Sequence, residues 1–191
     1  MRDREIEVTL SDDEQVHIQY SENSKEYYDI SVSDGNVLTM VNANNKEWTD
    51  YIGGKPSTKD RKIVLQMPTT LLDTVTLSTT NEDISLPVLA VTGSIDISTN
   101  DGNITFESLD VGNTLTLTVK NGDISGMIGG RYEDFVIQSE VKKGDSSLPK
   151  HKDIGKITVK VLFNNGDVDV TFVVYIKKYK DRRKDNNDNK E

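Results

Sequence analysis

Few side chains of this sequence are of the types that carry out acid–base, nucleophilic or metal chemistry. The chain has two histidines, His17 and His151, and no cysteine, which excludes disulfides, thiolate metal sites and cysteine nucleophiles. His17 stands in an alternating run and His151 in a polar stretch, so we expect both at the surface. There is no Gly-x-Ser-x-Gly elbow and no histidine pair at i, i+4. We therefore expect no catalytic residue, no cofactor and no metal ligand, and we expect that the protein is not an enzyme.

Acidic residues that recur in equivalent turns are the best candidates for metal ligands. They are Asp83, Asp123, Asp145 and Asp167. Calcium takes 6–8 oxygen ligands, which stacked turns could supply. However, the nine-residue glycine-rich calcium repeat is absent, and Asn103 interrupts the row of acids. We expect these side chains to cap backbone N–H groups as Asx turns, and calcium binding remains the alternative.

Two further segments could contact phosphate or anionic surfaces. Gly53 to Thr58 faintly resembles a phosphate-binding loop, but Pro56 follows Lys55 and the required earlier glycine is missing, so we predict a surface loop. The segment 177–191 carries seven basic and four acidic residues, a net charge of +3. Because the net charge of the whole chain is −9, residues 1–176 carry −12. A domain with this negative charge repels phosphate backbones, which argues against nucleic-acid binding. We predict a disordered, charged tail, with contact to an anionic surface as the alternative.

A repeat positions the turn acids. The fourth residues of five turn signatures fall at 84, 104, 124, 146 and 168, so the steps are 20, 20, 22 and 22. The alternating strands before these turns keep nearly the same step. They begin at Val75, Ile95, Leu115, Phe135 and Ile157. Two unlike features that repeat together indicate stacked coils, because one coil cannot bury its inner face alone.

The repeat predicts an all-β fold, a short single-stranded β-solenoid of about five coils. Ile95, Ile97 and Thr99 should point inward, and Ile84, Ile104 and Ile124 should form one column ~4.8 Å apart per coil. Further inward residues are expected on the later strands. They are Phe106, Leu109, Val111, Leu115, Leu117 and Val119. Gly102, Gly122, Gly144 and Gly166 should supply positive φ at the corners, whereas Glu82 requires a different first corner. The alternative is a β-sandwich, because Asn-Gly pairs between strands also mark hairpins.

The first 70 residues read as short alternating strands that are continuous with the solenoid. The expected strands are 6–10, 16–20, 28–32, 37–41 and 63–67, with a loop excursion over 42–62. The predicted organisation is an N-terminal strand region at 1–70, the repeat at 71–176 and the tail at 177–191. Only 34% of the residues are hydrophobic, which fits an elongated fold with much surface.

Several of these segments resemble the bacterial putative-adhesin domain family, a family of uncharacterised function. The resemblance rests on the strand from Ile63 to Pro68, the run from Leu72 to Thr76 and the repeated Asn/Asp-Gly-Asp/Asn-Ile units. The segment 35–40 and the region of Trp48 are also similar to that family, so the resemblance covers about residues 25–176. It implies a β-helix-like domain displayed outside the membrane behind an N-terminal anchor, which this sequence lacks.

The sequence thus favours a non-catalytic, adhesin-like binding or scaffold domain at the bacterial cell surface. Its partner would be an unidentified protein or glycan of the cell envelope, bound through the loops 42–62 and 142–153. A regulatory ectodomain that senses envelope stress through a membrane protein is an alternative. A carbohydrate-active β-helix enzyme is another, although a groove rich in aromatic and basic residues would be expected for it. The sequence leaves the oligomeric state open.

Overall fold

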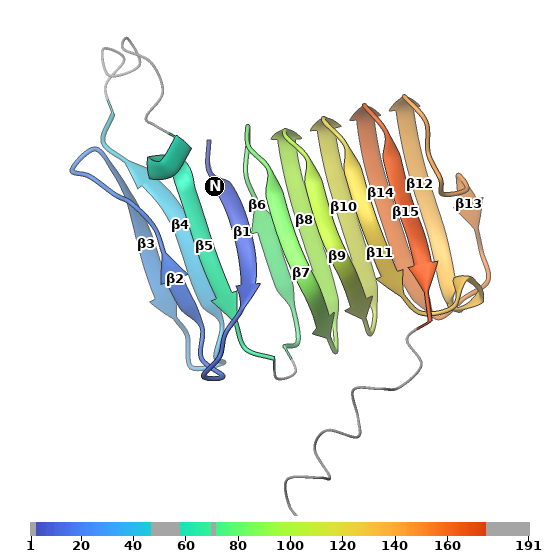
Figure 1. The fold of residues 1–191 in the computed structure, drawn as a ribbon, viewed down its shortest axis with the longest axis horizontal. Helices are drawn as coiled ribbons and strands as arrows, with labels where there is room; N and C mark the ends of the chain where they lie inside the picture. Colours follow the sequence, from blue (N-terminus) through green and yellow to red (C-terminus); the bar gives the residue numbers. More distant parts are fainter. Residues whose placement is uncertain (1–2, 47–57, 70–71, 175–191) are drawn as a thin grey trace, which may run out of the picture.

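The computed structural model describes residues 3–46, 58–69 and 72–174 and is built almost entirely of β-strands. Two large sheets face each other across one core, and a two-stranded sheet adjoins them (Figure 1). Sheet A consists, in spatial order, of β15 (Val168–Val173), β11 (Ile124–Gly129), β9 (Ile104–Val111), β7 (Ile84–Val91), β1 (Glu5–Leu10), β5 (Lys62–Met67) and β2 (His17–Gln19). Sheet C consists of β13 (His151–Lys152), β12 (Phe135–Lys143), β14 (Ile157–Asn165), β10 (Thr114–Asn121), β8 (Ser94–Asp101) and β6 (Val75–Ser78). Sheet B pairs β3 (Glu26–Val32) with β4 (Leu38–Asn44).

The predicted β-solenoid is confirmed. The coils that begin at β6, β8, β10 and β14 are each a strand of sheet C, a corner, and a strand of sheet A, whereas β12 is followed by β13 of the same sheet. Equivalent strands of neighbouring coils pair in parallel. Ile84 and Ile124 are the in-register partners of Ile104 on its two sides, so the predicted isoleucine column exists. Over residues 3–46, 58–69 and 72–174 the helical content is two short 3-10 turns, η2 (Thr58–Arg61) and η3 (Tyr132–Asp134). Within the described residues, no helix has the length and apolar character to cross a membrane.

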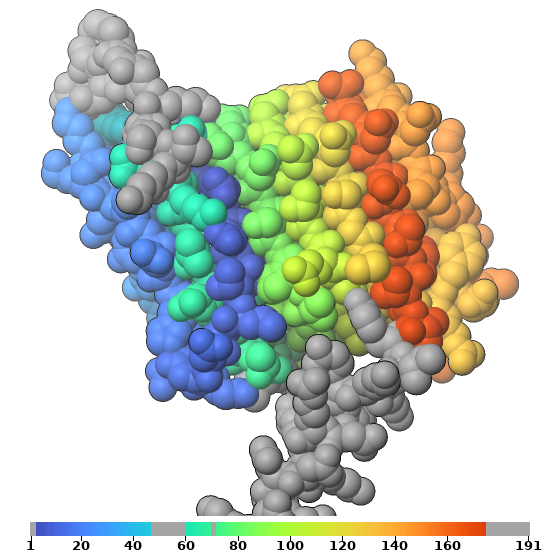
Figure 2. Space-filling view, viewed as in Figure 1, coloured from blue at the N-terminus to red at the C-terminus, as the bar shows by residue number. Residues whose placement is uncertain are grey.

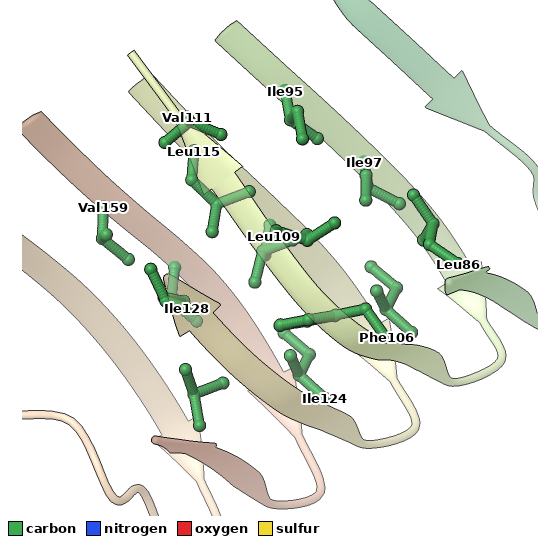
Figure 3. Close-up of a cluster of buried hydrophobic side chains, with 14 of the residues drawn as sticks. Leu86, Ile95, Ile97, Phe106, Leu109, Val111, Leu115, Ile124, Ile128 and Val159 are labelled. Atoms are coloured by element: carbon green, nitrogen blue, oxygen red, sulfur yellow. The ribbon is translucent and has the colours of Figure 1, made fainter. Parts of the chain in front are cut away.

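Alternate aliphatic side chains fill the space between sheets A and C. Figure 3 shows side chains from both sheets meeting there, among them Ile97, Leu109 and Leu115. Ile84, Ile95, Ile97, Ile104, Leu109, Leu115, Leu117 and Ile124 are completely shielded from solvent. The polar Thr99 is also buried, as its inward position predicts. Each such aliphatic side chain contributes ~1.5–3 kcal/mol by leaving water, so the stack is held mainly by this continuous core.

The coils do not stack in chain order, contrary to the simple step that the sequence predicts. β14 pairs with β10, and β12 lies beyond β14; likewise β15, not a strand of the fourth coil, pairs with β11. Leu115 is therefore in register with Val159, and Phe135 with Ile157.

The turn after β11 explains this order. β11 ends at Gly129, and Gly130 (φ 137°) and η3 carry the chain to the far side of a position that β14 and β15 later fill. Tyr132 and Phe135 then pack against Phe172 of β15, with ring centroids 5.4 and 5.0 Å apart, which closes the inserted coil against its neighbour.

The corners need glycine chiefly because successive coils approach each other closely. Gly122, Gly144 and Gly166 have the predicted positive φ, but the prediction is wrong for Gly102, which does not. A Cβ on Gly102 would lie 2.3 Å from the carbonyl oxygen of Glu82, a distance that no side chain tolerates. Glu82, which stands at the glycine position of the first corner, pairs with Arg61.

The N-terminal region extends the stack and holds a hairpin beside it. β1 lies in sheet A between β5 and β7. The buried Arg4 donates from Nε to the Tyr28 hydroxyl (2.6 Å) and pairs with Glu26 (3.3 Å), which also binds Lys46. Burial alone would raise the pKa of Glu26, but the hydrogen bond from Lys46 and the charge of Arg4 lower it. This ion network fixes β3 and β4 against the first coils.

Candidate binding groove on sheet A

A groove of about 740 Å³ crosses the outer face of sheet A. Its walls and floor come from the middle of β1, β7, β9 and β11. Figure 2 shows this face of the molecule, with β1 in dark blue, β7 and β9 in green, and β15 in red.

The groove exists because the pairing between β1 and β7 ends after two residues. They pair only at Ile6–Ile84 and Glu7–Ser85, whereas β1 stays paired with β5 as far as Met67. Pro87 follows on β7 and has no backbone N–H to donate, so the ladder cannot continue there. Sheet A therefore splits along its outer face, and the split is part of the groove.

Small polar side chains form the floor. Ser85, Thr105 and Ser125 are in-register partners on three neighbouring strands, and each stands at the same step of the repeat. Gly126 has a φ of 154°, and a Cβ there would lie 2.3 Å from the ring of Phe106. That glycine therefore leaves room for the phenyl ring beneath the floor. The result is a row of hydroxyl groups ~4.8 Å apart on a rigid sheet.

Two carboxylates lie beside this hydroxyl row. Glu7 of β1 is the in-register partner of Ser85, and Glu107 follows Thr105 by two residues on β9. The Glu7 carboxylate binds Lys62 Nζ at 2.5 Å, and Glu5 binds the same amine at 3.1 Å. The hydrogen bonds from Lys62 to Glu7 and Glu5 raise the pKa of that amine. Such a surface offers hydrogen-bond acceptors and donors to a polar ligand and contains no histidine.

The two histidines lie at the surface, where the sequence places them. His17 Nε2 contacts the carboxylate of Asp13 at 2.8 Å, and His151 contacts Asp153 at 2.6 Å. The Ser11 hydroxyl, and then His17, hold the pKa of Asp13 at about 2. Ser11 and His17 both bind Asp13, so the carboxylate lies between them and His17 is not placed as a base for the hydroxyl. This trio shapes the turn between β1 and β2.

The recurring turn acids bind backbone N–H groups of the neighbouring coil. Asp83 Oδ1 accepts from Asn103 N at 2.7 Å, and Asn103 Oδ1 accepts from Asp123 N at 2.8 Å. Asp123 then accepts from Asp167 N, and Asp167 from Asp145 N, each at 2.9 Å. These side chains accept backbone N–H groups, as predicted, but the prediction of local Asx turns is wrong, because the bonds run between coils and follow their swapped order. Among the described residues no three acidic or histidine side chains gather as a metal site would require.

Of the two predicted contact loops, the structure describes the loop 142–153 fully and the loop 42–62 only in part. Leu148 of the loop 142–153 is buried in the core, Ser147 Oγ bonds Val170 N, and His151–Lys152 pairs with β12, so this loop caps the end of the stack. In the loop 42–62, β4 extends to Asn44 and η2 begins at Thr58. Most of that loop, including residues 53–57 and Trp48, lies outside the described residues, as does the basic tail 177–191.

Sequence reasoning missed the groove itself. Two signals were available: hydroxyl side chains recur at the same step at positions 85, 105 and 125, and Pro87 stands inside a strand. Neither signal identifies a groove without knowing that β1 is the neighbour of β7.

The described residues form a parallel β-solenoid with a polar groove on one face. A family model described as Toastrack DUF4097 matches residues 1–126, so the chain belongs to the Toastrack DUF4097 family. The structure is also similar to the crystal structure of a protein described as a putative cell adhesion protein from Clostridium sporogenes. The TM-score is 0.54 and the identity 11%, over 90% of this chain and 89% of that one. No curated protein matches the sequence.

Proposed function

We propose that this protein is a non-catalytic, adhesin-like binding domain displayed at the bacterial cell surface by a membrane-anchored parent protein. The observation that carries the proposal is the groove on sheet A, with its hydroxyl floor and flanking carboxylates on a rigid stack. A rigid scaffold loses little conformational entropy when it binds, which favours recognition of a partner by many polar contacts. The description of the structural neighbour as a cell adhesion protein supports the same role.

The arrangement of the carboxylates supports binding over catalysis. The Cα atoms of Glu7 and Glu107 lie two strands and two residues apart, which is ~12 Å in a parallel sheet. Glu7 is turned to Lys62 on β5, the strand on the side away from β9. Paired glycosidase carboxylates face one another across the substrate, whereas the Glu7 carboxylate is directed away from the strand that carries Glu107. We therefore assign these acids to hydrogen bonding with a polar envelope ligand, either a glycan or a protein.

A binding screen with a matched pair of variants tests the proposal. The parent chain is applied to arrayed glycans and to immobilised matrix proteins, and each hit is measured again with Thr105→Arg and Thr118→Arg. Thr105 lies on the groove floor, and Thr118 is an outward residue of sheet C. We expect Thr105→Arg to weaken binding at least tenfold and Thr118→Arg to leave it unchanged, with both variants folded by circular dichroism. Absence of any hit, or equal binding by both variants, would overturn the proposal.

A further inference from the structure

At one position among the described residues, sheet A has a strand and sheet C has no strand facing it. β6, β8, β10 and β14 of sheet C each lead through a corner into a strand of sheet A, and along the chain β4 likewise precedes β5. In sheet A, β1 lies between β5 and β7. On the opposite side, the sheet C ladder ends at β6, and β4 pairs only with β3. Among the described residues, nothing occupies the place opposite β1, between β6 and β4.

A cavity of about 270 Å³ marks this place, which we call the strand slot. Its lining is mostly apolar. The apolar residues are Ile6 of β1, Ile18 of β2, Ile63 and Leu65 of β5, Leu77 of β6, and Leu38 and Met40 of β4, and Thr76 and Ser78 of β6 complete the lining. Ile6 and Ile63 are 4% and 3% exposed, so the floor continues the core of the stack. The volume is that of about nine water molecules at ~30 Å³ each, and an apolar cavity of this kind favours aliphatic side chains over water.

The edges of two strands form the walls of the strand slot. Thr79 N donates to Ser98 O, so odd-numbered residues of β6 bond to β8 and the backbone of Thr76 points away from it. Asn45 N donates to Lys25 O, so in the same way the backbone groups of Leu38 and Met40 point away from β3.

A buried polar group lies two residues beyond Met40 on the same strand. Asn42 follows Leu38 and Met40 at the alternate position of β4. Its amide nitrogen is buried and has no hydrogen-bond partner among the described residues. A strand in the slot would supply main-chain acceptors beside this donor.

The segment that leads into β1 makes the same backbone hydrogen bond as the corners of the complete coils. Ile6 N donates to Asp83 O at 3.0 Å, as Ile84 N donates to Asn103 O at 2.9 Å one coil further. Asp3 N and Arg4 N donate to the hydroxyls of Thr80 and Thr79, which directly follow β6. The corner of a coil is therefore present at β1, and the place of the strand before that corner is the slot.

We propose that the strand slot binds one extended strand of a partner polypeptide, parallel to β6, with aliphatic side chains at alternate positions. This occupant continues an interface that the molecule already has, since β8 lies in parallel register on the other edge of β6. Main-chain hydrogen bonds to the two edges supply affinity, and the aliphatic floor selects alternate side chains. The site lies at the junction of sheets B and C and does not depend on the groove on sheet A or on the function proposed for it.

The strand β10 supplies the peptide that tests this proposal. A fluorescein-labelled peptide of the sequence 114–121, whose inward side chains are Leu115, Leu117 and Val119, is titrated into the full chain and followed by anisotropy. We expect saturable binding. A peptide with aspartate in place of both leucines should bind at least tenfold more weakly, because its charges would enter an apolar cavity. Binding of the two peptides with equal affinity would overturn the proposal.

A matched pair of chain variants locates the binding. Leu38 lines the slot and is 36% exposed, and Val41, on the alternate face of β4, is 54% exposed, so an arginine at either position is compatible with folding. Leu38→Arg should weaken peptide binding at least tenfold, and Val41→Arg should leave it unchanged. No binding by the parent, or equal binding by the two variants, would overturn the proposal. Self-association that Leu38→Arg abolishes, without peptide binding, would assign the slot to a second copy and also overturn it.

Discussion

Replacing Ile104 with alanine is the sharpest test of the aliphatic column. Ile104 is completely shielded from solvent and lies between Ile84 and Ile124, which are equally shielded. Isoleucine-to-alanine changes in cores cost ~2–5 kcal/mol, and the cost rises when neighbours cannot collapse into the cavity. The neighbours of Ile104 are held by parallel ladders on both sides, so we expect a loss of about 3–4 kcal/mol in the free energy of unfolding.

Urea unfolding followed by far-ultraviolet circular dichroism measures this loss. At ~2–4 °C per kcal/mol for a chain of this size, the melting temperature should also fall by roughly 6–16 °C. The control is Thr105→Ala, since Thr105 is the exposed neighbour on the same strand; its effect should stay within about 0.5 kcal/mol. Ile104→Asp would bury an unpaired charge and should unfold the repeat. If Ile104→Ala were no more harmful than Thr105→Ala, the assignment of inward and outward faces would be wrong.

Three further results are expected. Gly122→Ala should cost about 1–3 kcal/mol in urea unfolding, because its Cβ would lie 2.1 Å from Gly102 O, whereas Gly35→Ala, whose Cβ would meet only Ser33 Oγ at 3.8 Å, should be near neutral; equal effects would contradict the close approach of coils. The pKa of Glu26 is lowered from 4.5, so its stabilising contribution is present above that pH and is lost as the pH falls through the lower, folded-state pKa. The stability difference between parent and Glu26→Gln should therefore shrink between about pH 7 and about pH 3, and a difference independent of pH would refute the network. Adding calcium should leave the melting temperature unchanged, because the turn carboxylates accept backbone N–H groups; a rise would restore the calcium hypothesis.

The periodic features of the sequence were enough to predict the coil and its core. The step between Ile84, Ile104 and Ile124 equals one coil, and β-branched alternation gives the inward face. The spatial order of the coils was not predictable in this way. Every coil presents the same kind of aliphatic edge, so the repeat specifies what may stack and not which coil comes next. The short turn η3, which decides the order, carries no periodic signal.

The sites depend on pairings between segments far apart in the chain. The groove requires β1 to lie beside β7, and the strand slot requires β1 to lack a facing strand. The alternation of apolar residues predicts that Ile6 and Val8 face inward, but it does not predict which strands lie beside β1. The hydroxyl row at 85, 105 and 125 was visible in the sequence, but its use as a floor follows only from the split beside Pro87.

Disulfide trapping in this cysteine-free chain measures the stacking and its order directly. Thr118 is in register with Leu162, and Leu162 with Glu140, so β14 separates Thr118 from Glu140. Neighbouring parallel strands place Cα atoms ~4.8 Å apart, within the ~4.4–6.8 Å that a disulfide spans, whereas the second neighbour lies ~9.6 Å away. We predict that the pair Thr118→Cys and Leu162→Cys oxidises readily to an intramolecular disulfide, and that the pair Thr118→Cys and Glu140→Cys stays reduced. The opposite result would show that the coils stack in chain order and would contradict the structure described above.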